Sequence, residues 1–167
     1  MLNLHTVSAN TPAVNEATQF AYRAWRELFG SRANPEAMPA DLARFEATYC
    51  QGEGCFLLAR APSGEVVASI GYRRYDHRFA ALDFTPWRTA EVVRLFVAPR
   101  LRRAGVASAL VSQLLAQAKA AGVQALYLHT HPFLPGALAF WQRQGFELLL
   151  TEAEPVWQTT HMARYHW

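Results

Sequence analysis

The sequence predicts an α+β fold in which a mostly antiparallel sheet is flanked by helices, and three observations support this prediction. Strand-like and helix-like segments follow one another in the irregular order β-α-α-β-β-β-α-β-α-β-β, which is typical of α+β domains. Residues 92–97 are almost continuously apolar and rich in β-branched and aromatic side chains, as in a strand buried on both faces. The segment that follows has apolar residues at helical spacing, namely Ala107, Leu110, Val111, Leu114, Leu115 and Ala118.

Five elements are expected in the first 75 residues. They are a strand at 2–8, helices at 12–29 and 39–49, and strands at 55–60 and 66–75. Pro12 occupies a favoured first helical position, and Gly30 ends that helix before a loop at 31–39. A Pro-Ser-Gly turn at 62–64 joins the two later strands.

The remaining elements follow a connection at 76–88, which is either irregular or a partial strand. We expect a strand at 92–97, a helix that ends before Gly122, a strand at 123–129, a helix at 135–144, and strands at 146–151 and 156–162. Pro99 ends the first of these strands because proline has no N–H to donate to a sheet. Gly145 ends the second helix.

The composition favours a single domain over residues 1–167. Of these residues, 51% are hydrophobic and 17% are charged, which allows a sizeable core and argues against a disordered chain. No apolar run approaches the length of a membrane span, and no basic run interleaved with aromatic residues indicates nucleic-acid binding. The N-terminus lacks the features of a secretory signal, and Cys50 and Cys55 are the only cysteines. We therefore expect reduced thiols and a cytoplasmic protein.

The turn between the strand at 92–97 and the following helix carries the sequence Arg-Arg-Ala-Gly-Val-Ala at 102–107. A helix N-terminus presents N–H groups without intrahelical partners and about half a positive charge, so it is suited to bind a phosphate group. Gly105 has no Cβ, which allows an anion to approach the backbone closely. A cluster of arginines strengthens the expectation of a polyanionic ligand: Arg94, Arg100, Arg102 and Arg103.

Two motifs in the chain resemble those of one enzyme family. Arg102, Gly105 and Ala107 fit R-x-x-G-x-A after the run Leu-Phe-Val-Ala-Pro at 95–99, and residues 137–146 fit A-x-x-F-W-x-x-x-G-F. With Glu91 at the start of the first strand, they resemble the acetyl-CoA signature and the second landmark of the GNAT N-acetyltransferases. The resemblance covers residues 50–150.

This resemblance implies a three-layer α/β/α sandwich with a mixed sheet, and acetyl-CoA as co-substrate. The residues that it implies for acetyl-CoA binding are Leu95, Phe96, Val97, Arg102, Arg103, Ala104, Gly105, Val106, Ala107, Ser108 and Phe140. It also implies direct acetyl transfer to a primary amine of a small molecule or a peptide. The sequence pattern described above leads us to expect no nucleic-acid or membrane partner. A different acyl donor, an acyl-CoA-binding regulatory module without turnover, and a homodimer stay open. Many family members have glycine where this chain has Arg103.

A proton must leave the amine during such a transfer, and three residues are candidates for the base. Glu91 occupies the position of a glutamate base in some family members, and it can serve as the base if burial raises its pKa. The alternative is a surface glutamate or the ion-pair partner of an arginine. His129 and His131 are expected to face the same side of a strand end, either as bases or as structural histidines. A metal site would need a third ligand beside this pair, and we expect none.

Trp141 stands where the resemblance implies a tyrosine that protonates the departing thiolate. An indole N–H is a donor only and is no acid near neutral pH. Trp141 therefore either packs beside Phe140 or donates a hydrogen bond to the sulfur. Leu134 replaces a frequent asparagine in the same region.

The acceptor pocket is expected to be built from the N-terminal helices, the loop at 31–39 and the C-terminal strands. Aromatic side chains suit a cationic amine. Six aromatic residues are candidates for the wall of this pocket, with core packing as the alternative: Trp25, Phe29, Tyr72, Tyr75, Phe84 and Trp87.

Overall fold

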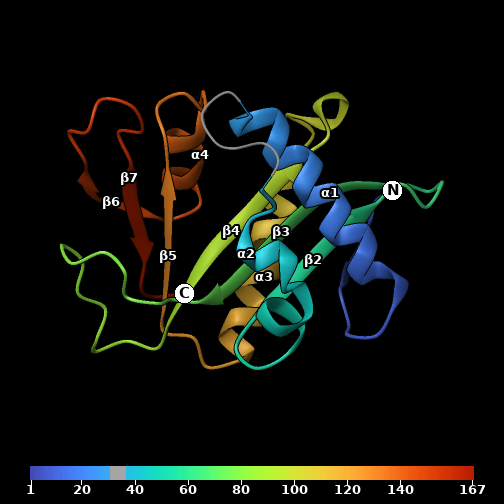
Figure 1. Ribbon diagram of the computed structural model, residues 1–167, viewed down its shortest axis with the longest axis horizontal. Coiled ribbons are helices and arrows are strands. Elements are labelled where there is room, and N and C mark those ends of the chain that lie inside the picture. Colours follow the sequence, from blue (N-terminus) through green and yellow to red (C-terminus); the bar gives the residue numbers. More distant parts are fainter. Residues whose placement is uncertain (31–36) are drawn as a thin grey trace.

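The computed structural model of the protein describes residues 1–30 and 37–167 and has one sheet with helices on both faces (Figure 1). The strands are β1 (Asn3–Thr6), β2 (Cys55–Arg60), β3 (Val66–Arg74), β4 (Thr89–Val97), β5 (Ala125–Thr130), β6 (Glu147–Thr151) and β7 (Thr160–Arg164). The helices are α1 (Pro12–Phe29), α2 (Ala40–Ala43), α3 (Val106–Ala120) and α4 (Ala137–Arg143). The predicted order of the elements is confirmed.

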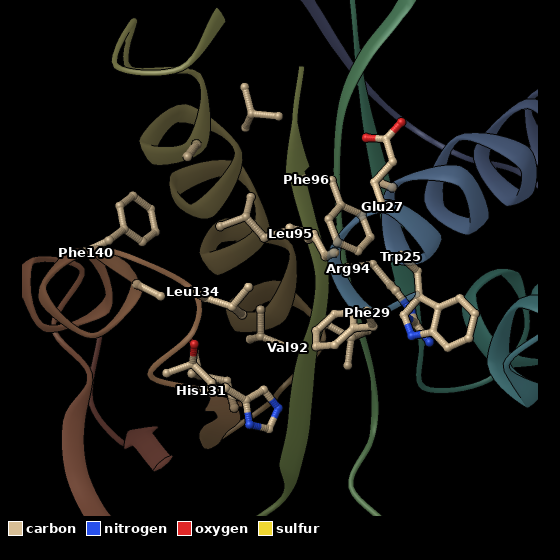
Figure 2. Close-up of a pocket in the computed structure, with 18 of the residues that line it drawn as sticks. Trp25, Glu27, Phe29, Val92, Arg94, Leu95, Phe96, His131, Leu134 and Phe140 are labelled. Carbon is tan, nitrogen blue, oxygen red and sulfur yellow. The ribbon is translucent and has the colours of Figure 1, made fainter. Parts of the chain in front are cut away.

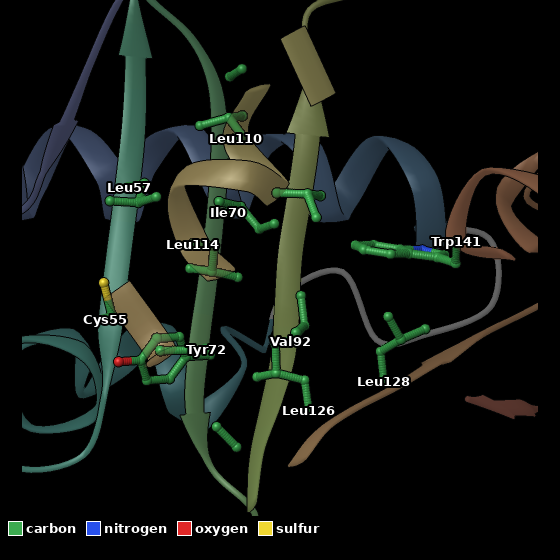
Figure 3. Close-up of a cluster of buried hydrophobic side chains, with 14 of the residues drawn as sticks. Cys55, Leu57, Ile70, Tyr72, Val92, Leu110, Leu114, Leu126, Leu128 and Trp141 are labelled. Carbon is green, nitrogen blue, oxygen red and sulfur yellow. The ribbon is translucent and has the colours of Figure 1, made fainter. Parts of the chain in front are cut away.

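The two faces of the sheet bury different helices because side chains alternate along each strand. Leu57 on β2 packs into the cluster that α3 covers, whereas its neighbours Phe56 and Leu58 pack into the cluster that α1 and α2 cover. Figure 3 shows Leu110 and Leu114 of α3 within the first of these clusters. The three-layer arrangement expected from the sequence is therefore present.

The sheet opens between β4 and β5. Its strands lie in the order β1-β2-β3-β4-β5-β7-β6, and each described pair is antiparallel except β4 with β5, which is parallel. The parallel pairing joins only 89–91 to 125–127. Beyond it the two strands diverge (Figure 1), and 93–97 are only half-buried. The expectation that 92–97 is buried on both faces is therefore wrong for most of that strand.

A β-bulge distorts β4 at the point where it leaves β5. Ser69 pairs with Phe96 and Gly71 pairs with Val93, so β4 has one more residue than β3 in this interval. Arg94 lies in the extra stretch with a φ of 59°. The hydroxyl of Ser69 donates a hydrogen bond to the Arg94 carbonyl at 2.9 Å, which stabilises the distorted backbone.

Several expected boundaries are wrong. The helix expected at 39–49 is divided into α2 and a π-helical segment, Glu46–Cys50. The last strand begins at Thr160 rather than at 156, because the carboxylate of Glu154 accepts the backbone N–H groups of Val156 and Trp157 at 2.6 and 2.7 Å and holds a turn there. The connection at 76–88 forms no strand. Of the loop expected at 31–39, residues 31–36 lie outside the described residues. Among the described helices, none combines the length and the apolar character that a membrane crossing requires.

Candidate active site

An open cavity of about 1160 Å³ lies where β4 and β5 diverge (Figure 2). Its walls come from α1, β4, the end of β5 and the start of α4, and one end reaches the turn before α3. In Figure 2, Trp25 and Phe29 of α1 lie on one side of β4, and Leu134 and Phe140 lie on the other. All residues from 91 to 97 line the cavity, so β4 runs along its length.

The turn before α3 has the features of a phosphate site. Gly105 precedes the helix with a φ of 80°, and no described side chain caps the first helical turn, which leaves its N–H groups available to a ligand. A Cβ built on Gly105 would meet no protein atom within 4 Å, so open space adjoins this backbone. Arg102 and Arg103 line the cavity from the same turn. These groups fit a pyrophosphate group.

Arg103 has a φ of 65°. Glycine adopts this left-handed conformation without steric cost, whereas other residues adopt it at a cost of about 1–2 kcal/mol. The backbone path therefore explains why proteins with the same motif often have glycine at this position. The arginine keeps that path and adds a guanidinium group at the edge of the cavity.

Seven of the eleven residues expected to bind acetyl-CoA line the cavity, and four do not. The seven are Leu95, Phe96, Val97, Arg102, Arg103, Ala107 and Phe140. Of the other four, Ala104 and Gly105 belong to the turn itself and Val106 packs in the core. The hydroxyl of Ser108 accepts a hydrogen bond from the side-chain amide of Gln144 at 3.1 Å. Their contacts with a cofactor stay predictions.

Glu91 is fully buried at the start of β4 and is held by arginines. Both Nη atoms of Arg78 donate to its carboxylate at 2.8 Å, and Arg73 lies 3.5 Å away. Burial favours a higher pKa of Glu91, but the Arg78 hydrogen bonds and the charges of Arg73 and Arg78 outweigh it, so the pKa lies below its usual value. The condition under which Glu91 would act as the base, a pKa raised by burial, is therefore not met. The ion-pair alternative describes this side chain.

His129 lies next to Glu91 and lines the cavity. Its Nδ1 atom is 3.6 Å from a carboxylate oxygen of Glu91 and 3.5 Å from the hydroxyl of Tyr127. Burial lowers the pKa of His129 to about 4, although the Glu91 carboxylate opposes this shift. His129 is therefore a neutral imidazole at physiological pH, and it is a proton acceptor in the wall of the cavity.

His131 also lines the cavity, and its ring lies 5.6 Å from that of His129. The expectation that the two histidines face the same side is confirmed. The Nδ1 atom of His131 is 3.0 Å from the backbone carbonyl of Trp157, and its ring stacks on Phe133 at 5.0 Å. No group of three His, Cys, Asp or Glu side chains that could hold a metal ion occurs in the described ranges.

A second buried carboxylate, Asp41 on α2, holds the bulge of β4. Arg94 donates to its two oxygens at 2.9 and 2.6 Å, and the hydroxyl of Tyr49 donates at 2.6 Å. Burial favours a higher pKa of Asp41, but the hydrogen bonds and charge of Arg94 lower it overall. Asp41 is therefore a carboxylate, and it fixes the arginine at the distorted position.

The sequence analysis missed three charged residues beside the cavity: Asp41, Arg73 and Arg78. None of them lies in a recognisable motif. The one available signal was the presence of Glu91 in a strand expected to be buried, since a buried carboxylate requires a cation nearby. That signal does not say which arginine provides it.

Trp141 is nearly buried, with 7% of its surface exposed, and belongs to the cluster beneath α3 (Figure 3). Its ring packs edge-on against Phe140 and Phe146, with ring centroids 5.0 and 5.2 Å apart. It also lines the cavity. The contacts favour the packing interpretation of this residue.

Only two of the six aromatic residues proposed for the acceptor wall, Trp25 and Phe29, line the cavity. The other four lie elsewhere in the described structure. Tyr72 packs in the cluster beneath α3, and Tyr75 and Phe84 pack with Tyr127. Trp87 contacts Tyr165, with ring centroids 5.3 Å apart. For these four, core or surface packing is the correct interpretation.

Comparisons with known proteins agree with the fold. A model of the "Acetyltransferase (GNAT) family" matches residues 18–146, whereas no curated protein sequence matches the chain. A GNAT-family acetyltransferase from Staphylococcus aureus Mu50 has 20% identity and a TM-score of 0.75 over 99% of each chain. An acetyltransferase from Streptococcus agalactiae 2603 has 17% identity and a TM-score of 0.73 over 98% of each chain. The PaiA N-acetyltransferase from Thermoplasma acidophilum, solved with coenzyme A, has 14% identity and a TM-score of 0.69 over 99% of each chain.

Proposed function

Because the chain belongs to the GNAT acetyltransferase family, we propose that it moves an acetyl group from acetyl-CoA to a primary amine by direct attack. One observation carries this proposal. A single cavity joins the turn before α3, which fits a pyrophosphate, to the neutral imidazole of His129. The apolar side chains along β4 and α4 between these two ends suit the pantetheine arm.

Bound acetyl-CoA supplies an activated thioester: the amine nitrogen bonds to the carbonyl carbon, the carbon–sulfur bond breaks, and CoA leaves as its thiolate, which takes a proton from solvent afterwards. The first-turn N–H groups of α3, with Arg102 and Arg103, hold the pyrophosphate. The backbone of 95–97, which lines the cavity, binds the pantetheine arm, and an N–H near Val97 polarises the carbonyl oxygen.

His129 takes the proton from the amine. A group with a pKa near 4 removes a proton poorly from a free ammonium, but the nitrogen becomes far more acidic as it bonds to the carbonyl carbon. Glu91 is the positioning residue: its carboxylate faces Nδ1 of His129 and stabilises the imidazolium that forms. Arg78 in turn holds Glu91 in this orientation.

No acid is required at Trp141. A thiol with a pKa near that of free cysteine, about 8.5, leaves as a thiolate at modest cost near neutral pH. Trp141 then contributes by packing against Phe140 at the cavity wall.

Trp141→Phe is therefore expected to keep most of the activity, because it preserves an aromatic ring and removes only the N–H. Trp141→Ala is expected to lower the free energy of unfolding by about 3–5 kcal/mol and to lose much more activity. Urea unfolding and steady-state rates across a pH series measure both effects. If Trp141→Phe is as inactive as Trp141→Ala while it stays folded, the indole N–H has a chemical role and the packing account is wrong.

The test of the proposed function is thiol release from acetyl-CoA in the presence of a panel of primary amines, together with calorimetric titration of acetyl-CoA. We expect micromolar binding and thiol release that depends on the amine. Micromolar binding with no release for any amine would favour a regulatory module that only binds acyl-CoA. Binding of a longer acyl-CoA in preference to acetyl-CoA would indicate a different acyl donor.

A further inference from the structure

Three arginines and two buried carboxylates form a layer beside the cavity. Arg94 makes a bidentate contact with Asp41, with hydrogen bonds of 2.9 and 2.6 Å. Arg78 makes a bidentate contact with Glu91, with two hydrogen bonds of 2.8 Å. These geometries are those of strong charge-assisted pairs. Each carboxylate thus has one close arginine partner, and the third arginine of the layer makes only longer contacts with the two carboxylates.

That arginine is Arg73 on β3. Its Nη2 atom donates a long hydrogen bond of 3.5 Å to Glu91, and its Nη1 atom lies 3.9 Å from Asp41. Both contacts are longer and weaker than those of Arg94 and Arg78. Its side chain is 29% exposed and lines the cavity. The guanidinium group of Arg73 is therefore held less tightly than those of Arg78 and Arg94, and it is partly accessible to a ligand in the cavity.

Asp76, which contacts Arg78 at 2.9 Å, brings the count to three arginines and three carboxylates. Because Asp76 is 59% exposed, solvent weakens its effect, and the side of the layer that faces the cavity keeps an excess of positive charge at Arg73. His129 is neutral because its pKa is about 4. On α1, Arg23 and Glu27 also line the cavity, and their charges are opposite.

Arg73 also lies close to the proposed base. It pairs with Glu91 across β3 and β4, and Glu91 pairs with Tyr127 across β4 and β5. His129 is two residues beyond Tyr127 and therefore on the same face of the sheet. Glu91 contacts both Arg73 and His129, so these two side chains are near each other. An acceptor with an anionic group at Arg73 and its amine at His129 must therefore have the two groups close together.

Aromatic rings form the neighbouring wall. Phe29, His131 and Trp157 line the cavity, with the ring of Phe29 at 6.1 Å from His131 and 6.4 Å from Trp157. The rings of His131 and Trp157 are 5.4 Å apart. Such a wall suits an apolar or aromatic group of the acceptor.

We infer that the acceptor is an α-amino acid with an apolar or aromatic side chain, and that Arg73 binds its carboxylate. The guanidinium fork matches a carboxylate in a way that an ammonium group does not. Polyamines, which carry several positive charges, are disfavoured by the same excess charge. This inference rests on the proposed function, because it names the acceptor of the same transfer.

The experiment compares matched acceptors that differ by the carboxylate: L-phenylalanine with 2-phenylethylamine, and L-tryptophan with tryptamine. The measured quantity is the ratio of kcat/KM within each pair, at saturating acetyl-CoA, for the wild type, Arg73→Gln and Arg73→Lys. We expect the wild type to prefer the amino acid by about 10- to 100-fold. Arg73→Gln removes this preference through KM, and Arg73→Lys keeps part of it. Comparing ratios between variants cancels the difference in amine pKa.

Arg74→Gln is the matched control, since Arg74 is the next residue on β3, is 79% exposed and contacts only Glu53 at 3.4 Å among the described charges. It should keep the wild-type ratio. Thermal unfolding confirms that each variant is folded. The inference is overturned if Arg73→Gln lowers kcat/KM equally for both acceptors of a pair, or if the wild type prefers the decarboxylated amines. Either result leaves the acetyltransferase assignment intact.

A second measurement separates the two proposals when no acceptor is acetylated. L-Phenylalanine and 2-phenylethylamine are titrated calorimetrically into the wild type and Arg73→Gln, both saturated with CoA. Binding of the amino acid that depends on Arg73, without turnover, supports the carboxylate subsite and overturns the transfer reaction. Neither binding nor turnover of an amino acid overturns the subsite.

Discussion

Replacing His129 by glutamine is expected to lower kcat for acetyl transfer by roughly 10²- to 10³-fold, the usual contribution of a general base. Glutamine keeps a polar side chain of similar size but cannot take a proton near neutral pH. The affinity for acetyl-CoA should stay unchanged, because His129 lies at the opposite end of the cavity from the turn before α3. His166→Gln serves as the control, since His166 is exposed near the C-terminus.

The pH dependence follows from the low pKa of His129. With a pKa of about 4, its imidazole gains a proton only well below pH 5, so it does not cause a loss of activity between pH 8 and 5. The activity in that range should instead rise with pH as the acceptor amine loses its proton. An acid limb with an apparent pKa near 6.5 in kcat/KM that disappears in His129→Gln would contradict the lowered pKa.

Glu91→Gln distinguishes the two candidate bases. If Glu91 only positions His129, its replacement should cost less than that of His129, with retained acetyl-CoA binding. If Glu91 is the sole base, Glu91→Gln should lower turnover by roughly 10²-fold while His129→Gln keeps the wild-type rate. Steady-state kinetics of both variants and of the double variant decide between these outcomes.

Replacing Gly105 by glutamate is expected to weaken acetyl-CoA binding by more than about 100-fold. The carboxylate would occupy the space beside the first turn of α3 and repel the pyrophosphate. Glutamate would also be strained at the φ of 80° found for Gly105. Calorimetric titration with acetyl-CoA gives the dissociation constant, and circular dichroism shows whether the variant is folded.

Gly52→Glu is the matched control for this variant. Gly52 has a φ of 68°, and a Cβ there would also meet no atom within 4 Å, so the substitution adds the same charge and similar backbone strain away from the cavity. It should bind acetyl-CoA like the wild type. A folded Gly105→Glu variant with unchanged affinity would show that the pyrophosphate does not bind at this turn.

The local features of the site could be predicted from the sequence, because they depend on neighbouring residues. The strand, the turn at 102–107 and the helix after it form one continuous segment, and their periodicity and glycine are visible in the chain. The divergence of β4 from β5 was not visible, since it depends on a bulge whose register involves Ser69 on another strand.

The network of arginines and carboxylates could not be predicted from the sequence. Its residues are far apart in the chain or lie in segments without regular secondary structure. Asp41 and Arg94 are 53 residues apart, and Arg78 lies in a connection without periodicity. The sign of the pKa shift at Glu91 depends on Arg78, so the sequence could not show whether the condition for a glutamate base is met. Trp141, in contrast, could be interpreted as a packing residue because it follows Phe140 in a helical pattern.

The contact between Asp41 and Arg94 limits how the N-terminal region can be exchanged between members of the family to change the acceptor. Asp41 belongs to α2, in the N-terminal region proposed to contribute to the acceptor pocket, whereas Arg94 belongs to β4, which lines the cavity. A chimera that imports a foreign N-terminal region without an aspartate here would leave a desolvated guanidinium with no counter-charge, at a cost of about 3–5 kcal/mol. Exchange of this region therefore has to carry both residues together, or neither.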